Sequence, residues 1–380
     1  MSESPPSFRP LLLSYGPPAA AFALAWLAFS GVVLANGFPY TAENFSKWDA
    51  TLYQSIAQKG YEFFPCAGQS MWGGQSWCGN TGWLPLFPWL MALVAIVIRS
   101  LPIASMLVTA ACFYAVLWLV WTRLLASEMN ARGLLLLAIT ASFPGALYYI
   151  VPYPITLFLL LTLLAFESLL AGRWVWAGVL GGLAAATYSS GLVLFGVFGL
   201  YLLIDGRQRP VIKLARAIAI CCGLTALGLV LVLIFFQIRV GHWDAFFQVQ
   251  AKYGYGLHDP LAVFLEKVVA MFRGEYRGRE EFQGFQHLLV SGWILALLVI
   301  ATSKGPPSRR ELLSLIYGVA FWLFPLVVGS GALLWRAESL LLPTVVLGRR
   351  LSVPVLSIFL SAAVLLSGEI TLQYFKNWLP

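Results

Sequence analysis

Long apolar stretches with almost no charged residues recur from one end of this chain to the other. Many reach about 20 residues, the length that a helix needs to cross the hydrocarbon core of a bilayer, which is roughly 30 Å thick. Hydrophobic residues make up 60% of the chain and charged residues only 11%, whereas soluble domains contain about 25% charged residues. The pattern therefore predicts an all-α polytopic membrane protein with a single transmembrane domain over residues 1–380.

The apolar stretches predict about eleven transmembrane helices. They are expected near 12–35, 103–122, 133–151, 155–171, 174–188, 191–204, 211–238, 287–303, 312–329, 337–348 and 352–372. The first is expected to be a retained span, because its apolar run is long for a cleaved signal peptide. Residues 174–204 are also compatible with one long helix. Residues 84–100 contain two prolines near their start and Arg99 near their end, a pattern compatible with a span or with a helix at the outer interface. We favour the interface, because a crossing would move Arg123, Arg132 and Arg173 to the outer side.

The net charge of +8 does not indicate nucleic-acid binding, because the basic excess lies in short loops between apolar segments, as at 207–216. Short basic loops mark the cytoplasmic side of a membrane protein. This orientation predicts two large extracytoplasmic loops, 36–102 and 239–286, and a bacterial inner membrane as the location. Both loops are rich in aromatic residues and glycine, a composition that is unusual for disorder. We expect them to fold back onto the helices and to cover a cavity.

Two of the five cysteines, Cys66 and Cys78, lie in the polar first loop, whereas the others lie within apolar runs. In an oxidising compartment they are expected to form a disulfide, which would stabilise the folded state by roughly 3 kcal/mol in the chain-entropy model. The alternative is a pair of free thiols. A zinc site is not expected, because no histidine lies nearby in the sequence.

Several familiar catalytic and cofactor sites are absent from the sequence. It contains no glycine-rich phosphate loop, no His-x-x-x-His pair and no Gly-x-Ser-x-Gly motif. The three histidines, His242, His258 and His287, are too scattered to predict a metal site. No soluble domain is present that could bind a nucleotide sugar. We therefore expect no cofactor and no metal, and substrates that are themselves in the membrane.

The first predicted outer loop contains a carboxylate among aromatic residues, in the sequence Trp48-Asp49-Ala50. A positioned carboxylate can remove the proton from an attacking hydroxyl group, so Asp49 is a candidate catalytic base. Trp48 and Tyr53 are candidate substrate-binding residues, because their rings could exclude water and stack on a sugar. The alternative is that Asp49 only caps a helix beside the membrane.

The order of motifs in this loop resembles the PIG-V family of mannosyltransferases, which belongs to the GT-C superfamily of polytopic glycosyltransferases. The matching residues are Trp48-Asp49-Ala50, Tyr53, Gly60-Tyr61 and Leu84-Pro85-Leu86-Phe87-Pro88. Looser matches follow at Phe143-Pro144, Pro152-Tyr153, 241–250, and Trp335-Arg336 with Pro343. The resemblance therefore extends over most of the chain.

The resemblance implies a GT-C-like bundle and an inverting transfer of a sugar, mannose or another hexose, from a polyprenyl-phosphate donor. Such enzymes use no nucleotide and generally no metal. The chain departs from the family pattern at two places. It has Pro154 and Ile155 where the family usually has a glutamate, and it reads Tyr188-Ser189-Ser190-Gly191 where the family has an arginine before Asn-Gly. The segment with the two cysteines also resembles an insertion. The sugar and the acceptor, a lipid or a glycan, therefore stay open.

A leaving lipid phosphate gains negative charge, which a cation can stabilise. Arg336 follows a predicted span at its outer end, and Lys252 lies in the second loop beside Gln250 and Tyr253. These four residues are candidates for binding the donor. The alternative for both cations is ordinary contact with the membrane interface. Glu338, two positions after Arg336, is not at a helical pairing distance from it.

Two other function classes compete with an enzyme: a transporter or flippase of a lipid-linked saccharide, and a structural membrane subunit. Transporters usually place ionisable groups in mid-span, whereas most charges in this chain lie at span ends or in loops. This distribution favours an enzyme at the membrane surface. Its predicted partners are a polyprenyl-phosphate sugar, a lipid or glycan acceptor and membrane lipids, without nucleic acid.

Overall fold

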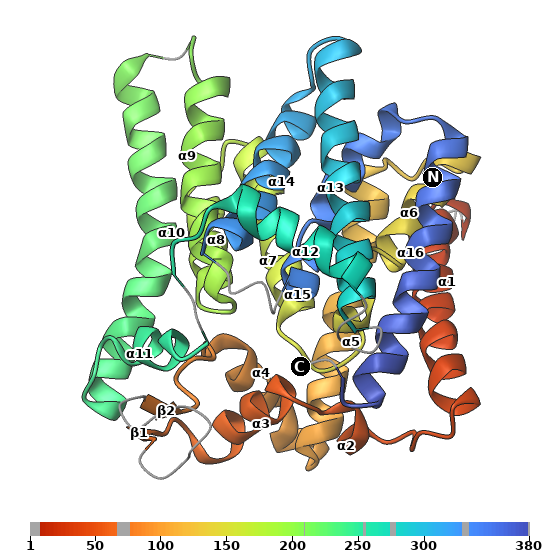
Figure 1. Cartoon of the computed structure of the whole chain (residues 1–380). Helices are drawn as coiled ribbons and strands as arrows, with labels where there is room; N and C mark the ends of the chain where they lie inside the picture. The colour runs from red at the N-terminus through yellow and green to blue at the C-terminus, as the bar shows by residue number, and fades with distance from the viewer. Residues whose placement is uncertain are drawn as a thin grey trace, which may run out of the picture.

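The computed structural model describes residues 8–66, 77–208, 210–253, 256–273, 279–328 and 334–378, and these form a bundle of helices (Figure 1). Among the described residues, six helices are long and apolar enough to cross a membrane. They are α1 (Phe8–Ala35), α5 (Leu101–Leu119, prolonged by a π-helical turn to Leu124), α10 (Val211–Val240), α13 (Arg279–Ser303), α14 (Arg309–Val328) and α16 (Val353–Phe375). They indicate an integral membrane protein and coincide with predicted spans.

Further apolar helices of 10–17 residues complete the bundle. They are α4 (Leu86–Ile98), α6 (Ala131–Ala141), α7 (Ile155–Leu170), α8 (Trp174–Ala185) and α9 (Val193–Asp205). The segment 174–204 therefore forms two helices instead of one. The 13 residues of α4 span only about 20 Å at 1.5 Å per residue, which is shorter than the hydrocarbon core.

The predicted span at 337–348 is not a separate membrane helix. The chain forms the short helix α15 (Leu334–Ser339) there, followed by a 3-10 helix from Leu342 to Arg350. Residues 337–348 are buried among other helices, apart from the partly buried Ala337. An apolar sequence satisfies a protein interior as well as a bilayer, so hydropathy alone did not distinguish the two environments.

The remaining elements gather mainly at one end of the bundle, at the bottom of Figure 1. They are α2 (Ala42–Phe45), α3 (Asp49–Lys59), β1 (Phe63–Pro65), β2 (Trp77–Gly79) and α11 (Ala245–Ala251), while α12 (Pro260–Arg273) crosses the side of α13. Parts of the two predicted outer loops, residues 67–76, 254–255 and 274–278, lie outside the described residues. The α9–α10 and α13–α14 connections lie at the opposite end.

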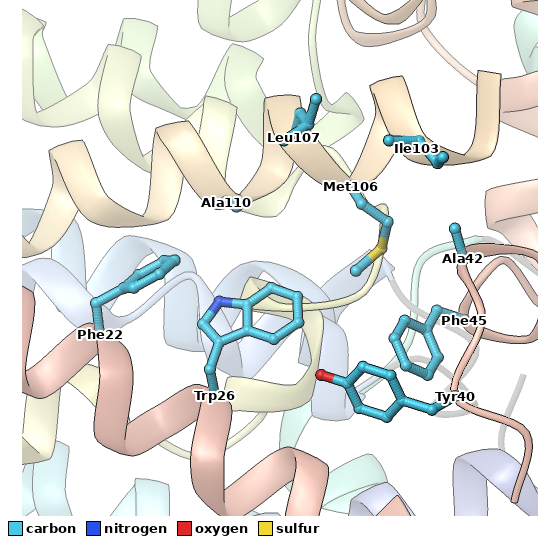
Figure 2. A pocket seen from close by; sticks show the side chains of 9 residues that line it. All are labelled: Phe22, Trp26, Tyr40, Ala42, Phe45, Ile103, Met106, Leu107 and Ala110. Atoms are coloured by element: carbon cyan, nitrogen blue, oxygen red, sulfur yellow. The ribbon is translucent and has the colours of Figure 1, made fainter. Parts of the chain in front are cut away.

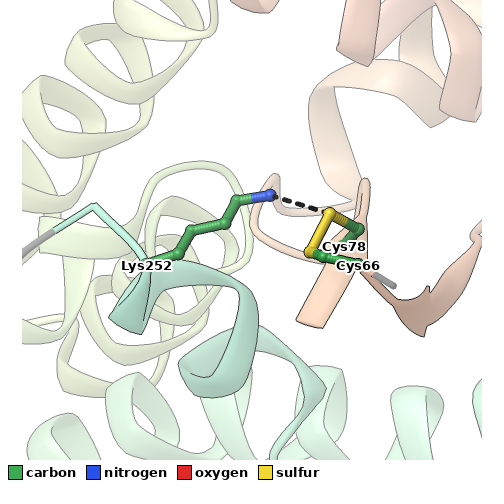
Figure 3. The surroundings of a disulfide bond; sticks show 3 residues. All are labelled: Cys66, Cys78 and Lys252. Carbon is green, nitrogen blue, oxygen red and sulfur yellow. Dashed lines mark hydrogen bonds between the residues drawn. A yellow bond between two sulfur atoms is a disulfide. The ribbon is translucent and has the colours of Figure 1, made fainter. Parts of the chain in front are cut away.

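The predicted disulfide between Cys66 and Cys78 is confirmed, with Cα atoms 5.1 Å apart (Figure 3). It closes the antiparallel hairpin of β1 and β2, in which Phe64 pairs with Cys78. The Nζ of Lys252 lies 3.8 Å from the Sγ of Cys78, so the two predicted loops meet at the hairpin. Disulfides persist in oxidising compartments.

Peptide mapping under non-reducing conditions is expected to recover Cys66 and Cys78 in one linked product. Reduction is expected to destabilise the protein by about 3 kcal/mol, because the closed loop restricts the unfolded chain. The buried free cysteines Cys112, Cys221 and Cys222 are the internal control and should resist alkylation in the native protein. Alkylation of Cys66 and Cys78 without prior reduction would contradict the linkage.

Helices α8 and α10 pack closely through glycines, as small residues allow between membrane helices. A Cβ atom added at Gly228 would overlap the carbonyl oxygen of Gly182, and one added at Gly182 would lie 2.6 Å from the carbonyl oxygen of Leu224. The two backbones are therefore too close for any side chain at this crossing.

The Gly228→Val variant is expected to be destabilised by about 1–3 kcal/mol, the usual cost of overpacking. Thermal unfolding in detergent would measure the loss. Gly223→Val is the matched control on the same helix, because a Cβ at Gly223 meets no atom within 4 Å. Equal melting temperatures for the two variants would contradict the close crossing.

Candidate functional site

The candidate base Asp49 is the first residue of α3, directly after a strained backbone position. Trp48 has φ 55° and ψ −127°, a positive-φ conformation outside the left-handed helical region that is unusual for a bulky aromatic residue. The carbonyl of Trp48 accepts a hydrogen bond from the Thr51 hydroxyl at 2.7 Å, which helps to hold this turn. Trp48 occupies the N-cap position of α3, and Asp49 is the acidic residue of its first turn.

The carboxylate of Asp49 forms an ion pair with the guanidinium of Arg336, which donates from Nη1 to Oδ2. These two residues are 287 positions apart in the chain and both were candidates from the sequence. The Arg336 side chain is only 6% exposed and that of Asp49 20% exposed. Burial lowers the pKa of Arg336, but the Asp49 carboxylate and the nearby tyrosines together outweigh burial and hold this pKa well above its ordinary value.

Tyrosines surround this ion pair. The Arg336 guanidinium carbon lies 5.7 Å from the ring centre of Tyr153, within the range of a cation–π contact. Burial raises the pKa of Tyr53 and Tyr188, and the nearby Asp49 carboxylate raises both further. Burial and Asp49 together raise the pKa of Tyr253 to about 12, against the opposing charge of Arg336. The phenol groups are therefore protonated at neutral pH and can donate hydrogen bonds.

Sequence reasoning did not assign Tyr153 and Tyr188 to the site. Tyr153 follows Pro152 in a quoted motif, and Tyr188 stands in the turn between α8 and α9 where the family pattern places an arginine. That motif was the available signal for Tyr153. For Tyr188 the sequence offered none, because its approach to Asp49 depends on how α8 and α9 are placed in the bundle.

The other predicted binding residues lie where the two loops meet. The amide of Gln250 donates to the carbonyl of Gly82 at 2.7 Å and so joins the loops. The Nζ of Lys252 lies 5.1 Å from the ring centre of Tyr253 and also contacts the disulfide. Tyr253 itself packs edge-on against Trp83, with ring centres 6.3 Å apart. The structure thus places Gln250 and Lys252 at the hairpin and Tyr253 between the hairpin and the ion pair.

The segment before Asp49 is fastened to the end of α16. The Lys47 Nζ donates to the Phe375 carbonyl and to the Asn377 side chain, each at 3.0 Å. The Tyr374 hydroxyl donates to the Phe45 carbonyl at 2.8 Å and accepts from the backbone N–H of Lys47 at 3.1 Å. These bonds hold Trp48 and Asp49 against the bundle.

Two apolar grooves lie between helices of the bundle. One, of about 310 Å³, lies between α1 and α5 beside α2 and is lined by residues such as Trp26, Phe45 and Met106 (Figure 2). The other, of about 290 Å³, lies between α4, α8 and α10 and is lined by residues such as Trp89 and Ala186. Ala186 accepts a backbone hydrogen bond from Leu86 at 3.1 Å and stands two residues before Tyr188.

Within the described part of the chain, no group of three or more His, Cys, Asp or Glu side chains is placed to hold a metal ion. The arrangement around Asp49 instead combines one carboxylate, one guanidinium and several phenols. Comparison with models of known protein families and with curated protein sequences found no match for this chain. The chemistry of these groups therefore carries the functional argument.

Proposed function

We propose that the protein is an inverting glycosyltransferase of the GT-C type, similar to the PIG-V family. It would move mannose or another hexose from a polyprenyl-phosphate donor to a lipid or glycan acceptor, outside the cytoplasm. The observation that carries this proposal is the ion pair of Asp49 and Arg336, because a transfer of this kind needs one base and one cation for phosphate. The six long apolar helices, the shorter apolar helices packed with them and the two predicted outer loops would house it.

In the proposed reaction, a hydroxyl oxygen of the acceptor attacks the anomeric carbon from the side opposite the phosphate. The hydroxyl proton passes to the Asp49 carboxylate, and a new C–O bond forms. The bond between the anomeric carbon and the phosphate oxygen breaks, and its electron pair leaves with the phosphate. Asp49 becomes neutral as the phosphate gains one negative charge. Arg336 can therefore exchange its ion pair with Asp49 for an ion pair with the phosphate.

The free hydrogen-bonding capacity of Arg336 supports its proposed role. Its Nε atom is buried and has no hydrogen-bond partner among the described residues. Planar guanidinium groups bind phosphate oxygens through two parallel N–H groups. A donor phosphate could therefore bind at Nε while Nη1 still contacts Asp49.

The groove between α4, α8 and α10 suits the polyprenyl tail of the donor. Its lining includes Trp89, Leu183 and Phe235, and Ala186 on its wall is close in sequence to Tyr188 beside the ion pair. A tail in this groove would stay in hydrocarbon while its phosphate reaches Arg336. The phenols of Tyr53 and Tyr253 would then face the sugar and could donate hydrogen bonds to it.

The second candidate function is transport of a lipid-linked saccharide. The observation that favours it is the burial of Arg336 within the bundle, since buried ionisable groups in membrane proteins also mark transport pathways. A transporter would bind the same lipid but would not break the bond between sugar and phosphate.

The test is to incubate the purified protein with a panel of polyprenyl-phosphate hexoses and a lipid extract that supplies acceptors. We expect one donor to be converted to polyprenyl phosphate, with Asp49→Asn inactive. Glu167→Gln is the matched control, because it alters an ion pair with Arg310 in another part of the bundle. Donor moved across vesicle membranes without cleavage would support transport instead. Neither cleavage nor transport of any donor would refute both proposals.

A further inference from the structure

A buried side-chain contact joins α15, the helix that carries Arg336, to α13. The Nδ1 of His287 on α13 lies 2.5 Å from the Oε1 of Glu338 on α15. The His287 side chain is 1% exposed and that of Glu338 3% exposed. Removing one partner of a buried hydrogen-bonded pair leaves a buried polar group unsatisfied, which is destabilising. The contact therefore fixes how α15 sits against α13.

Gln286 strengthens this contact from the neighbouring position on α13. Its Nε2 donates to the other carboxylate oxygen of Glu338 at 2.7 Å and to the carbonyl of Trp335 at 3.2 Å. The remaining polar atoms, Gln286 Oε1 and His287 Nε2, have no hydrogen-bond partner among the described residues. The hydrogen bonds that these two side chains make are thus directed at α15.

Arg336 and Glu338 face different elements from the same short helix. At about 100° per residue, side chains two positions apart are rotated by about 200° around the helix axis, so they point to nearly opposite sides. Arg336 accordingly reaches Asp49 on α3, while Glu338 reaches α13. Any rotation of α15 that frees Glu338 from His287 would also turn Arg336 away from Asp49.

Other contacts hold the backbone just beyond Glu338. The Tyr149 hydroxyl donates to the Ser339 carbonyl at 2.5 Å, and the Tyr317 hydroxyl donates to the Leu340 carbonyl at 2.7 Å. These bonds hold the backbone at the end of α15, and side-chain contacts hold the helix further. Glu338 makes such a contact through both of its carboxylate oxygens.

We infer that Glu338, held by His287 and Gln286, is a positioning residue that aims Arg336 at the phosphate of the donor. This inference rests on the proposed function, because it takes phosphate as the ligand of Arg336. Glu338 acts through Arg336 and touches no substrate. Its loss should therefore weaken phosphate binding only where Arg336 can form its full set of hydrogen bonds.

A double-mutant cycle tests this coupling, with radiolabelled polyprenyl phosphate as the probe and protein in nanodiscs. We expect Glu338→Ala to raise the Kd for polyprenyl phosphate by about 10- to 100-fold, since misplacing a binding group by about 1 Å can cost that much. In an Arg336→Lys background the same change should raise the Kd less than about threefold, because the planar guanidinium is already missing.

Equal effects of Glu338→Ala in both backgrounds, or no effect in either, would overturn the inference. If Glu338→Ala does not fold, Glu338→Gln replaces it in the same cycle and is judged by the same criterion. Glu167→Gln should leave the Kd unchanged. A protein that does not bind polyprenyl phosphate at all would refute the proposed function, whereas additive effects in a protein that binds it would refute only the role of Glu338.

Discussion

Replacing Asp49 by asparagine is expected to slow sugar transfer by about 10²- to 10⁴-fold, the usual effect of removing an acid–base group. Asparagine keeps the shape of the side chain and can still accept a hydrogen bond from Arg336, so the variant should stay folded. It can no longer take a proton from the acceptor. Initial rates with the donor identified from the panel would measure the loss.

The two kinetic constants separate a lost base from a lost binding group. With Asp49 neutral, the phosphate no longer competes for Arg336, so the KM for the donor should stay equal or fall while kcat falls steeply. Glu167→Gln is the control for a changed ion pair. Turnover by Asp49→Asn close to that of the natural protein would remove Asp49 from the mechanism.

Replacing Arg336 by alanine is expected to impair binding and catalysis together. The negative charge on the phosphate grows as its bond to the sugar breaks, so the loss of the cation should lower kcat by about 10²- to 10³-fold and also raise the donor KM. Arg336→Lys should recover part of the rate, because lysine keeps the charge and loses the planar pair of donors. Steady-state kinetics over a range of donor concentrations would measure both constants.

A structural side effect is distinguishable from this result. Alanine leaves the Asp49 carboxylate without its partner, so the melting temperature of Arg336→Ala is compared with that of Arg336→Lys before the kinetics are interpreted. A donor-bound structure with the phosphate far from Arg336 and among other cations would contradict the assignment. In that case Asp49 would be the remaining candidate of the pair.

The helices of the bundle were largely predictable, because the tendency to cross a bilayer depends on about 20 consecutive residues. The long apolar helices, such as α1 and α16, lie where the hydropathy pattern placed them. The same pattern also predicted a span at 337–348, where the structure has a buried 3-10 helix. Burial in lipid and burial in protein impose the same local composition, so only the tertiary contacts separate them.

The chemistry of the site was predictable in part for a similar reason. Charged residues are scarce in this chain, so Asp49 and Arg336 stood out as candidates from the sequence alone. The cysteine pair stood out because both residues lie in one polar loop, and the structure confirms their disulfide. Residue type is a property of a single position and hydropathy is a property of a short segment. Both can be read directly from the sequence.

The partners of these residues were decided by the tertiary structure. Asp49 and Arg336 are 287 positions apart, and no local pattern links them. The partner of Glu338 is likewise distant in sequence, since His287 lies 51 positions before it. Such pairs form because a buried charge must find an opposite charge or a hydrogen bond wherever the packed helices provide one. The amino-acid sequence by itself therefore determined which groups are available, and the packing of the helices decided which of them meet.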